Sequence, residues 1–507
     1  MGKNIFNSVQ VEKPKKNVFD LSHDVKMSMK MGNLTPVLVT ECVPGDSFQI
    51  GCDSLIRFAP MVAPVMHRMD VSVHYFFVPN RLTWDNWEKY IVDANTPNPL
   101  PYINYTDDFT ADQKKFLDYM GVPPNTGTGI TQALNALPIA AYQAIYNEYY
   151  RDENLVTEVD YTLADGNNTG DVTDLVKMRQ RAWEHDYFTA SLPFAQKGTA
   201  VDIPIGTIDT DVAVNFNSLE NSALYFNVIL NDGVTPQTVN AGSTAGVSTT
   251  GNPGVIAKTS DLDIQPTTIN DLRRAFRLQE WLEKNARGGT RYIENILMHF
   301  GVRSSDKRLQ RPEYITGLKT PVIISEVLNT SATAEEAQGN MAGHGVAVST
   351  GKYGNYFCEE HGYIIGIMSV MPQPAYQQGI PKTYLKSDPL DFFWPSFAHI
   401  GEQPVTNNEL YAYTATAEDT FGYVPRYAEY KYQASRVAGD FRTVLDYWHL
   451  GRIFATQPAL NDTFIECTPD QCERIFAVQD GEDNLYCQIM HKIKAVRPMP
   501  KFGTPNF

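Results

Sequence analysis

Hydrophobic and polar positions alternate with a period of two in several short segments, the pattern of half-buried β-strands. Residues 69–79 are one such segment, with Val71, Val73, Tyr75 and Phe77 on one face. Residues 34–52 hold two more β-like runs around the turn Pro44-Gly45-Asp46, and 362–373, 428–441 and 473–480 have strand composition. Long loops rich in proline and aromatic residues separate these runs. The pattern predicts a mainly β fold, a sandwich or jelly roll with insertions.

Other segments have the spacing of short helices. Thr83 is placed to cap a helix over 83–91, Thr110 and Gln113 form a capping box before 111–120, and Pro138 opens a third helix. This third helix carries a stripe of large side chains on one face: Tyr142, Ile145, Tyr146 and Tyr149. Such a stripe can stack on nucleic-acid bases. Core packing or a subunit contact explains it better, and we expect one of these.

Residues 205–262 differ from the rest of the chain in composition. Between 206 and 259 there is one lysine, no arginine, and much Gly, Ser, Thr and Asn. The alternating runs 212–217 and 223–230 predict a hairpin, and Asp232-Gly233 predicts the next tight turn. We interpret 205–262 as a solvent-facing insertion with a β base. An interdomain linker is the alternative, and the two strand-like runs argue against it.

Residues 267–314 are basic and helical in pattern. Positions 273–311 hold ten basic and four acidic side chains, and Gly288-Gly289 divides the segment into two helices. The stretch NARGGTR resembles a phosphate-binding loop, because small residues free the backbone amides between Arg287 and Arg291. Its spacing is not that of a nucleotide-hydrolysing P-loop. Two interpretations fit: contact with nucleic-acid phosphates, and salt bridges between subunits.

Charge is spread unevenly over the 507 residues. The net charge of -16 argues against a general nucleic-acid-binding protein. Both ends are nevertheless basic, since residues 1–40 carry a net +3 and residues 484–507 a net +4. Basic ends on an acidic body predict that one surface meets an anion while another faces water.

Cysteines and apolar runs limit the class of protein further. The six cysteines show no CxxC spacing, which indicates reduced, mostly buried thiols of a protein made in a cytosol. Residues 1–24 hold no apolar run long enough for a secretory signal. The longest apolar stretch, 363–371, is about half the length of a membrane helix, so we expect no membrane insertion.

We expect no catalytic, cofactor-binding or metal site and therefore no enzyme. The chain lacks HExxH, GxSxG and P-loop motifs. The cluster CEEH at 358–361 offers metal-ligand side chains but has no second half. The run 184–186, Glu-His-Asp, cannot form a relay because adjacent strand residues point in opposite directions, so we expect a hydrogen-bonded structural role. His74 is expected to be structural as well.

A series of sequence blocks carries a specific resemblance. They include YNEYYRDENL, RAWEHDYFTASLPFAQKG and DFFWPSFAHIGEQPV, and lie at 41–91, 146–155, 182–198, 275–317, 369–382, 391–405 and 422–442. In this order, over nearly the whole chain, they resemble the major capsid protein of microviruses, small icosahedral bacteriophages with single-stranded DNA. The long insertion before the 275–317 block resembles the gokushovirus subgroup more than the coliphage type.

The resemblance implies an eight-stranded antiparallel jelly roll of the viral capsid type with long inserted loops and several short helices. Many copies would close into an icosahedral shell of the simplest kind. The chain then divides into an N-terminal arm (1–33), a first jelly-roll part with helical insertions (34–204), the insertion (205–262), the rest of the jelly roll (263–483) and a basic C-terminal arm (484–507).

The resemblance also implies partners and a location. The partners are other copies of the chain, a single-stranded DNA genome, a small basic DNA-packaging protein, a pilot protein, a scaffolding protein during assembly, and a host-surface receptor. The location is the virion, assembled in the cytoplasm of a bacterial host.

Two sets of residues are candidates for these contacts. We expect the basic tail to lie on the inner wall of the shell and neutralise phosphates, with an arm tying subunits together as the alternative. The DNA-contact candidates are Arg287, Arg291, Lys492, Lys494, Arg497 and Lys501. In the subgroup the insertion forms a protrusion at the threefold axes thought to meet the host. The candidates there are Phe216, Tyr225, Phe226, Asp232, Gly233 and Gly246.

Two other classes of protein fit parts of the pattern. One is a spike or tail component of a virion. The other is a lectin-like or glycan-active β-sandwich, which would need paired carboxylates in a cleft or a set of ligand-binding loops, and usually a secretion signal. The blocks favour a structural shell protein that encloses single-stranded DNA.

Overall fold

The computed structural model describes residues 15–93, 97–199, 201, 269–328, 341–351, 353–478 and 481–502, with four short strands between 214 and 257. The chain forms two units, Met1–Ala195 with Asn285–Phe507, and Gln196–Lys284. The larger unit is built on two antiparallel sheets. The expectation of a mainly β, antiparallel sandwich is confirmed.

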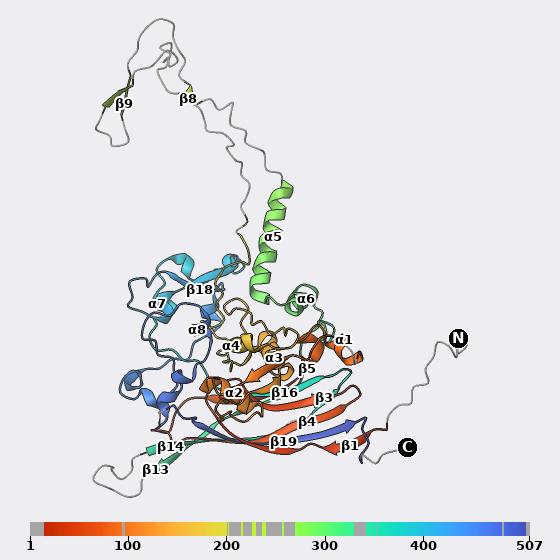
Figure 1. Cartoon of the computed structure of the whole chain (residues 1–507). Helices are drawn as coiled ribbons and strands as arrows, with labels where there is room; N and C mark the ends of the chain where they lie inside the picture. Colours follow the sequence, from red (N-terminus) through yellow and green to blue (C-terminus); the bar gives the residue numbers. More distant parts are fainter. Residues whose placement is uncertain are drawn as a thin grey trace. The chain divides into compact units, whose positions relative to one another are not determined.

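The larger sheet has seven strands in the order β1-β19-β4-β14-β13, with β2 beside β19 and β15 beside β4. Its centre is the pair β4 (Ser47–Phe58) and β19 (Leu485–Arg497), which run side by side at the lower edge of the larger unit in Figure 1. The other strands are β1 (Asn17–Asp20), β2 (His23–Met29), β13 (Ile323–Leu328), β14 (Met341–Thr350) and β15 (Gly354–Phe357).

Strand β19 occupies the residues for which the sequence predicts a basic arm. Residues from 484 onward were expected to form a basic arm, yet Leu485–Arg497 is paired with β4 on one side and with β1 and β2 on the other. A thirteen-residue strand that pairs with other strands along both of its edges is a central strand of the fold. Only residues beyond Arg497 can therefore extend from the sheet.

The smaller sheet has four strands in the order β12-β5-β16-β3. They are β12 (Glu313–Pro321), β5 (Met69–Pro79), β16 (Gly362–Pro372) and β3 (Thr35–Cys42). The predicted strands in 34–52, 69–79 and 362–373 are confirmed by β3, β4, β5 and β16. The two sheets hold seven and four strands, so the implied number of eight is not confirmed.

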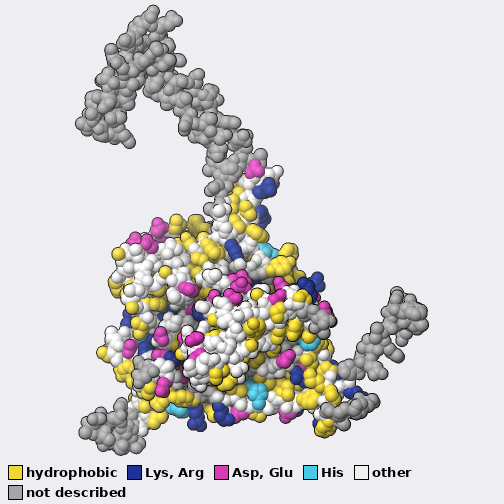
Figure 2. Space-filling model, in the orientation of Figure 1, with side chains coloured by type: hydrophobic (Ala, Val, Ile, Leu, Met, Phe, Trp, Pro, Cys, Tyr) yellow, Lys and Arg dark blue, Asp and Glu magenta, His cyan; other side chains and the backbone are white. Residues whose placement is uncertain are grey.

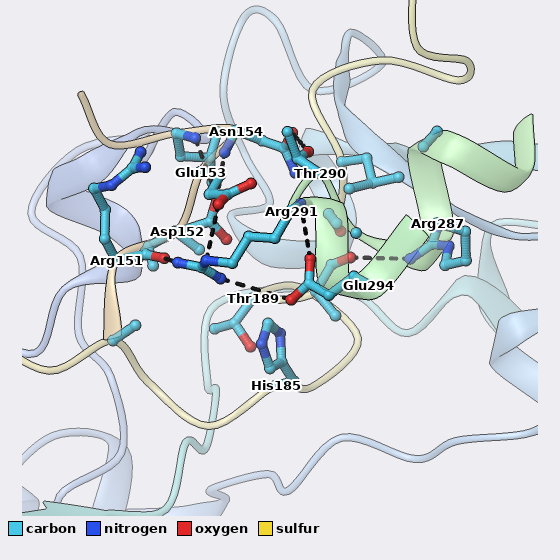
Figure 3. A pocket seen from close by; sticks show the side chains of 18 of the residues that line it. Arg151, Asp152, Glu153, Asn154, His185, Thr189, Arg287, Thr290, Arg291 and Glu294 are labelled. Carbon is cyan, nitrogen blue, oxygen red and sulfur yellow. Dashed lines mark hydrogen bonds and ion pairs between the residues drawn. The ribbon is translucent and has the colours of Figure 1, made fainter. Parts of the chain in front are cut away.

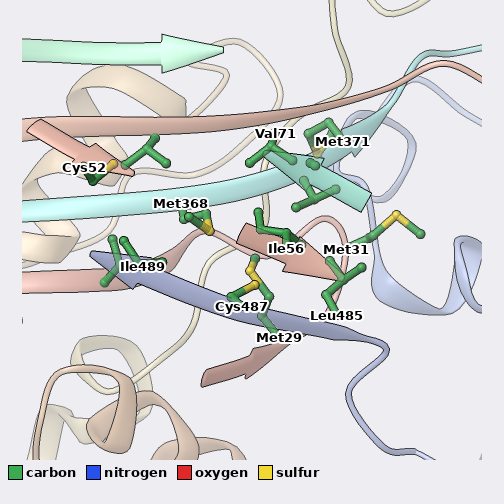
Figure 4. Packing of buried hydrophobic residues seen from close by; sticks show 14 of the residues in the cluster. Met29, Met31, Cys52, Ile56, Val71, Met368, Met371, Leu485, Cys487 and Ile489 are labelled. Carbon is green, nitrogen blue, oxygen red and sulfur yellow. The ribbon is translucent and has the colours of Figure 1, made fainter. Parts of the chain in front are cut away.

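The inner faces of the two sheets enclose the main hydrophobic core. Figure 4 shows Ile56 and Ile489 of the larger sheet facing Val71 and Met368 of the smaller one. All four side chains are essentially inaccessible to water. Burial of this apolar surface, at roughly 25 cal/mol per Å², is what holds the sandwich together.

Helices cover the outer face of the smaller sheet. They are α1 (Trp87–Val92), α2 (Ala111–Tyr119), α3 (Leu137–Ile145), which continues as a π-helical turn over Tyr146–Tyr150, and α4 (Val172–Leu175). Phe76 of β5 and Ile365 of β16 pack against these helices in a second core. The central strands β5 and β16 are thus buried on both faces, and the expectation that 69–79 is half-buried is wrong.

The helix predictions in this region hold in part. The capping box is confirmed, since Thr110 Oγ1 accepts from Gln113 N at 3.2 Å and Gln113 Oε1 accepts from Thr110 N at 2.9 Å. Tyr142 and Tyr146 are buried, so the tyrosine stripe packs in the core. The predicted cap at Thr83 is wrong: α1 begins at Trp87, and Thr83 Oγ1 donates instead to the carbonyl of Asn80 at 2.9 Å.

A third cluster is formed by the last part of the chain. It contains β17 (Glu402–Thr406), β18 (Thr420–Pro425), α7 (Asn407–Leu410) and α8 (Asp462–Ile465), which pack around Phe421 and Phe464. The predicted strands at 428–441 and 473–480 are wrong. These segments form 3-10 turns instead, at Ala428–Tyr430, Gly439–Arg442 and Glu473–Ile475.

The basic segment contains the two expected helices, α5 (Ile269–Gly288) and α6 (Tyr292–Phe300), divided at Gly288-Gly289. In the smaller unit, β8 (Val214–Asn215) pairs with β11 (Ile256–Ala257), and β9 (Phe226–Ile229) pairs with β10 (Pro236–Val239). The predicted pairing of 212–217 with 223–230 is therefore wrong. Within the described residues, no helix combines the length and apolar character of a membrane span.

Candidate nucleic-acid interface

The outer face of the seven-stranded sheet is exposed, in contrast to that of the four-stranded sheet. Along β19 the side chains alternate strictly, with Leu485, Ile489 and Ile493 in the core and Tyr486 and Lys494 exposed. No helix among the described residues packs on this outer face. We call it the open face. It brings together two of the predicted DNA-contact residues, Lys492 and Lys494.

Most cations of the open face have an acidic neighbour. Lys26 Nζ lies 2.6 Å from Asp24 Oδ2, and Lys492 forms an ion pair with Asp53 of β4. The hydrogen bond from Lys492 lowers the pKa of Asp53, and the same bond raises the pKa of Lys492. A phosphate could recruit Lys492 only by competing with this carboxylate.

Lys494 is the predicted candidate best placed to meet an anion. It is exposed, and its register partner on β1 is Asp20. Hydrogen bonds from Ser22 lower the pKa of Asp20, and the charge of Lys494 acts in the same direction. In the described part of the chain, no carboxylate lies close enough to the Lys494 ammonium to form an ion pair.

Two further residues of this face were missed from the sequence. Arg57 of β4 is exposed and lies opposite Tyr486 of β19, whose side chain is 50% exposed. A cation beside an aromatic ring can bind both a phosphate and a base. The alternation of β4, with Ile50, Cys52, Ile56 and Phe58 inward, already placed Arg57 on the outer face.

Arg497 and Lys501 lie beyond this cluster. Arg497 Nε donates to Asp46 Oδ2 at 3.0 Å, which fastens the end of β19 to the turn between β3 and β4. Asp46 is fully buried, so Arg497 has a structural role there. Lys501 is exposed, and its ammonium lies 6.0 Å from the ring centre of Phe502.

Arg287 and Arg291 line a separate cavity of about 550 Å³. Figure 3 shows Arg291 extended between Glu153 and Glu294, with its Nε 2.8 Å from Glu153 Oε1. Arg287 forms a bidentate ion pair with Glu402. Burial raises the pKa of Glu153, while the charge of Arg291 opposes this shift. Both arginines are neutralised within the chain, so the salt bridges that the sequence suggested are intramolecular.

The NARGGTR loop is also occupied by the chain's own carboxylate. Glu294 Oε2 accepts from the backbone N–H of Arg291 at 3.1 Å. A Cβ at Gly289, whose φ is +104°, would lie 2.1 Å from the same carboxylate oxygen. The positive φ favours glycine at this position, and the Glu294 carboxylate bonded to the loop would have to be displaced by a bound phosphate.

The other candidate clusters have structural partners. Asp186 accepts from the N–H groups of Phe188 and Thr189 and, at 2.7 Å, from the hydroxyl of Tyr376, which confirms a hydrogen-bonded role. In CEEH, Glu360 pairs with Arg81 and Glu359 with Lys307. In the described residues no three His, Cys, Asp or Glu side chains are grouped as metal ligands.

Two further predictions concern the cysteines and the residues of the insertion. All six cysteines are buried and none forms a disulfide, as expected. Of the host-contact candidates, Phe226 lies on β9. The others lie outside the described residues: Phe216, Tyr225, Asp232, Gly233 and Gly246.

Comparisons with known proteins agree with the resemblance seen in the sequence. The profile of the family "Capsid protein (F protein)" matches residues 7–507. The capsid protein VP1 of Chlamydia phage 1 is 34% identical over 99% of this chain and 98% of its own length. VP1 of Bdellovibrio phage phiMH2K is 37% identical, over 96% and 94%, and VP1 of Spiroplasma virus 4 is 31% identical, over 96% and 94%.

These matches extend through both sheets, the helices that cover the smaller sheet and the insertion. The family is one of structural proteins rather than enzymes, and its members are components of virions. Members of a capsid family assemble with copies of themselves into a shell. The chain belongs to the F-protein family of bacteriophage capsid proteins, as a major structural protein of the capsid.

Proposed function

We propose that the chain forms the shell of a virion around single-stranded DNA and that the open face of the seven-stranded sheet meets this DNA. The observation that carries the proposal is the pair of exposed cations, Arg57 and Lys494, on a face where aromatic Tyr486 is exposed as well. Arg57 is paired with Tyr486 of β19, and Lys494 lies further along the same strand. At about 3.4 Å per residue, Tyr486 and Lys494 are roughly 27 Å apart, so one strand of DNA can run along β19.

The energetics favour weak contacts repeated many times. Each phosphate neutralised by a lysine or arginine releases condensed counterions, which gives sequence-independent and salt-dependent binding. Two cations per copy give little affinity alone, but a shell repeats them at fixed spacing, and the contacts reinforce one another. The basic segment after β19, with exposed Lys501, adds to this charge in the same way.

A charge-removing variant tests the proposal. In the double variant Arg57→Gln with Lys494→Gln, particles should form in normal yield and hold less DNA. The DNA that remains should be released at a lower salt concentration. The measurement is the ratio of DNA to protein in purified particles across a salt series. Both substitutions are on an exposed face and should leave the fold intact.

A matched control separates this effect from a general loss of charge. Lys89 of α1 is exposed on the helical side of the molecule, so Lys89→Gln should leave the DNA content and its salt dependence unchanged. If the double variant holds as much DNA as the parent protein at every salt concentration, the open face is not the DNA-contacting surface.

The insertion is the part of the chain that we assign to host attachment. Residues Gln196–Lys284 form a unit of their own, which supports a role separate from that of the sandwich. A receptor on the host surface would be the partner. A small basic DNA-packaging protein, a pilot protein and a scaffolding protein remain further partners in this proposal, with assembly in the cytoplasm of a bacterial host. Particles lacking 205–262 should assemble but fail to adsorb to host cells.

A further inference from the structure

Residues 387–400, here called the aromatic segment, expose an unusual amount of apolar surface. The side chains of Leu390, Phe392, Phe393, Trp394, Phe397 and Ile400 are between 36% and 57% exposed. Over α7 and β18, Figure 2 shows yellow hydrophobic side chains at the surface among white polar ones. Large apolar side chains that are exposed close together in this way mark a binding surface in a soluble protein.

The aromatic segment is held in place by hydrogen bonds to its backbone. Trp394 N donates to the hydroxyl of Tyr427 at 3.3 Å, and that hydroxyl donates to the carbonyl of Phe392 at 3.2 Å. Phe393 N donates to the hydroxyl of Tyr430 at 3.3 Å. The indole of Trp394 donates to the carbonyl of Pro389 at 2.9 Å. An exposed aromatic group that is already ordered loses little entropy when it binds.

A cavity of about 520 Å³ is lined by aromatic and basic side chains, among them Tyr384, which precedes this segment in the chain. We call it the tyrosine cavity. Its lining includes Tyr187, Tyr376, Tyr384, Tyr432, Arg436 and Arg442. Its volume is within the range of about 300–1,000 Å³ that is typical of ligand-sized pockets, enough to admit large aromatic side chains.

The charges of the cavity are unbalanced in favour of the cations. Its two acids are neutralised, since Glu409 Oε1 lies 3.2 Å from Lys382 Nζ and Glu429 Oε1 lies 3.3 Å from Lys386 Nζ. Arg436 and Arg442 are exposed, and neither forms an ion pair with any residue that the structure describes. The cavity therefore presents uncompensated positive charge beside its aromatic walls.

The aromatic segment has the opposite charge. It contains Asp388 and Asp391 and no lysine or arginine. We infer that the aromatic segment of one copy of this chain inserts into the tyrosine cavity of a neighbouring copy, with its aspartates facing Arg436 and Arg442. Apolar character and charge are complementary, and a shell protein meets other copies of itself at every edge.

This inference goes beyond the proposed contact with DNA and does not depend on it. It identifies an interface between copies, whose central anchors are Phe393 and Trp394. Aromatic and arginine side chains at the centre of an interface contribute most of its binding free energy. Failure of the interface would prevent particles from forming, whereas failure of the DNA contact would leave particles with less DNA.

A photo-crosslinking amino acid at position 393 tests the contact in whole particles. Particles are assembled from a mixture of ¹⁵N-labelled and unlabelled chains, and crosslinked peptides are identified by mass spectrometry. We expect crosslinks of mixed isotope between position 393 and peptides within 376–384 or 432–442. The same probe at Val92, an exposed residue of α1, should give no crosslink to these peptides. The inference would be overturned if position 393 formed crosslinks only within one chain or only to another protein. Crosslinks to other parts of a neighbouring copy would overturn it as well.

Two variants measure the contribution of the interface. Arg436→Glu should reduce the yield of assembled particles about tenfold or more, because it places a like charge opposite the aspartates. Phe393→Ala should also reduce the yield, while Lys89→Glu, a charge reversal on α1, should not. The Tm of the unassembled protein should stay within a few degrees in the charge variants. Normal particle yield from Arg436→Glu and from Phe393→Ala would rule the contact out.

Discussion

The two sheets of the sandwich share one core but differ on their outer faces. Every residue of β16 is buried, because its inner face meets the larger sheet and its outer face meets α2 and α3. In β19, buried and exposed residues alternate along almost the whole strand. The same backbone geometry thus gives an apolar run in one sheet and an amphipathic strand in the other. What packs on the outer face decides which pattern the sequence must have.

This difference separates stability from function. The four-stranded sheet and its helices hold two cores, and a polar side chain on either face would have to be desolvated there. The open face of the seven-stranded sheet holds Arg57, Tyr486 and Lys494 without such a cost. The contacts with DNA proposed for the open face could therefore vary while the fold is maintained by the covered sheet.

The largest effect on the free energy of unfolding should come from truncating a residue on the outer face of the smaller sheet, which the helices cover. Ile365→Ala removes a fully buried side chain that packs against Phe76 and the helices, and should cost about 2–5 kcal/mol of unfolding free energy. Met490→Ala on the open face, where the side chain is 39% exposed, should change it by less than about 0.5 kcal/mol. Urea unfolding of the two purified variants measures both values. Equal losses would mean that the open face is covered in the folded protein.

The sequence predicted the strands and capped helices whose signals are local. Alternation and turns gave β3, β4, β5 and β16, and the capping box gave α2. The charge of residues 484–507 favours a basic arm, whereas their periodicity favours a strand. Leu485, Cys487 and Ile489, followed by Ile493 and Ala495, recur at alternate positions, with Gln488, Lys492 and Lys494 between them, and this is the signal for a strand.

Other predictions are wrong because they depend on contacts between residues that are far apart in the sequence. The aromatic residues in 428–441 suit a strand, but Tyr427 and Tyr430 are used to anchor the aromatic segment, and a positive φ at Tyr427 turns the chain there. The partners of Arg287 and Arg291 are Glu402 and Glu153, more than 100 residues away in sequence. Local spacing cannot show that a basic loop is already neutralised by such distant carboxylates.

An effect of intermediate size on stability should come from lowering the pH, because a histidine is buried between the two sheets. Burial lowers the pKa of His491 to about 4, and its ring bonds the hydroxyl of Tyr75 at 3.0 Å and the carbonyl of Val37 at 2.9 Å. The unfolded chain binds this proton near pH 6.5, so stability falls as the pH drops from about 6.5 to 4. Each unit of the shift corresponds to about 1.4 kcal/mol.

The slope of Tm against pH measures this effect. His491→Gln should flatten the slope between pH 6.5 and 4, although it lowers Tm at neutral pH. His399, an exposed histidine of the aromatic segment, provides the control, and His399→Gln should leave the slope unchanged. An unaltered slope in His491→Gln would show that the acid sensitivity arises elsewhere, for instance at His67 or His74, whose pKa values burial also lowers to about 4.

The smallest effect should come from the ion pair between Asp53 and Lys492 on the open face. Both side chains are more than a third exposed, so Asp53→Asn should cost less than about 1 kcal/mol, and less still in high salt. The same change releases Lys492 from its carboxylate and adds an uncompensated cation to the face proposed to meet DNA. Particles of this variant should therefore retain their DNA at higher salt than the parent, with almost no change in Tm. Earlier release of DNA would show that Asp53 supports the contact instead of competing with the phosphates for Lys492.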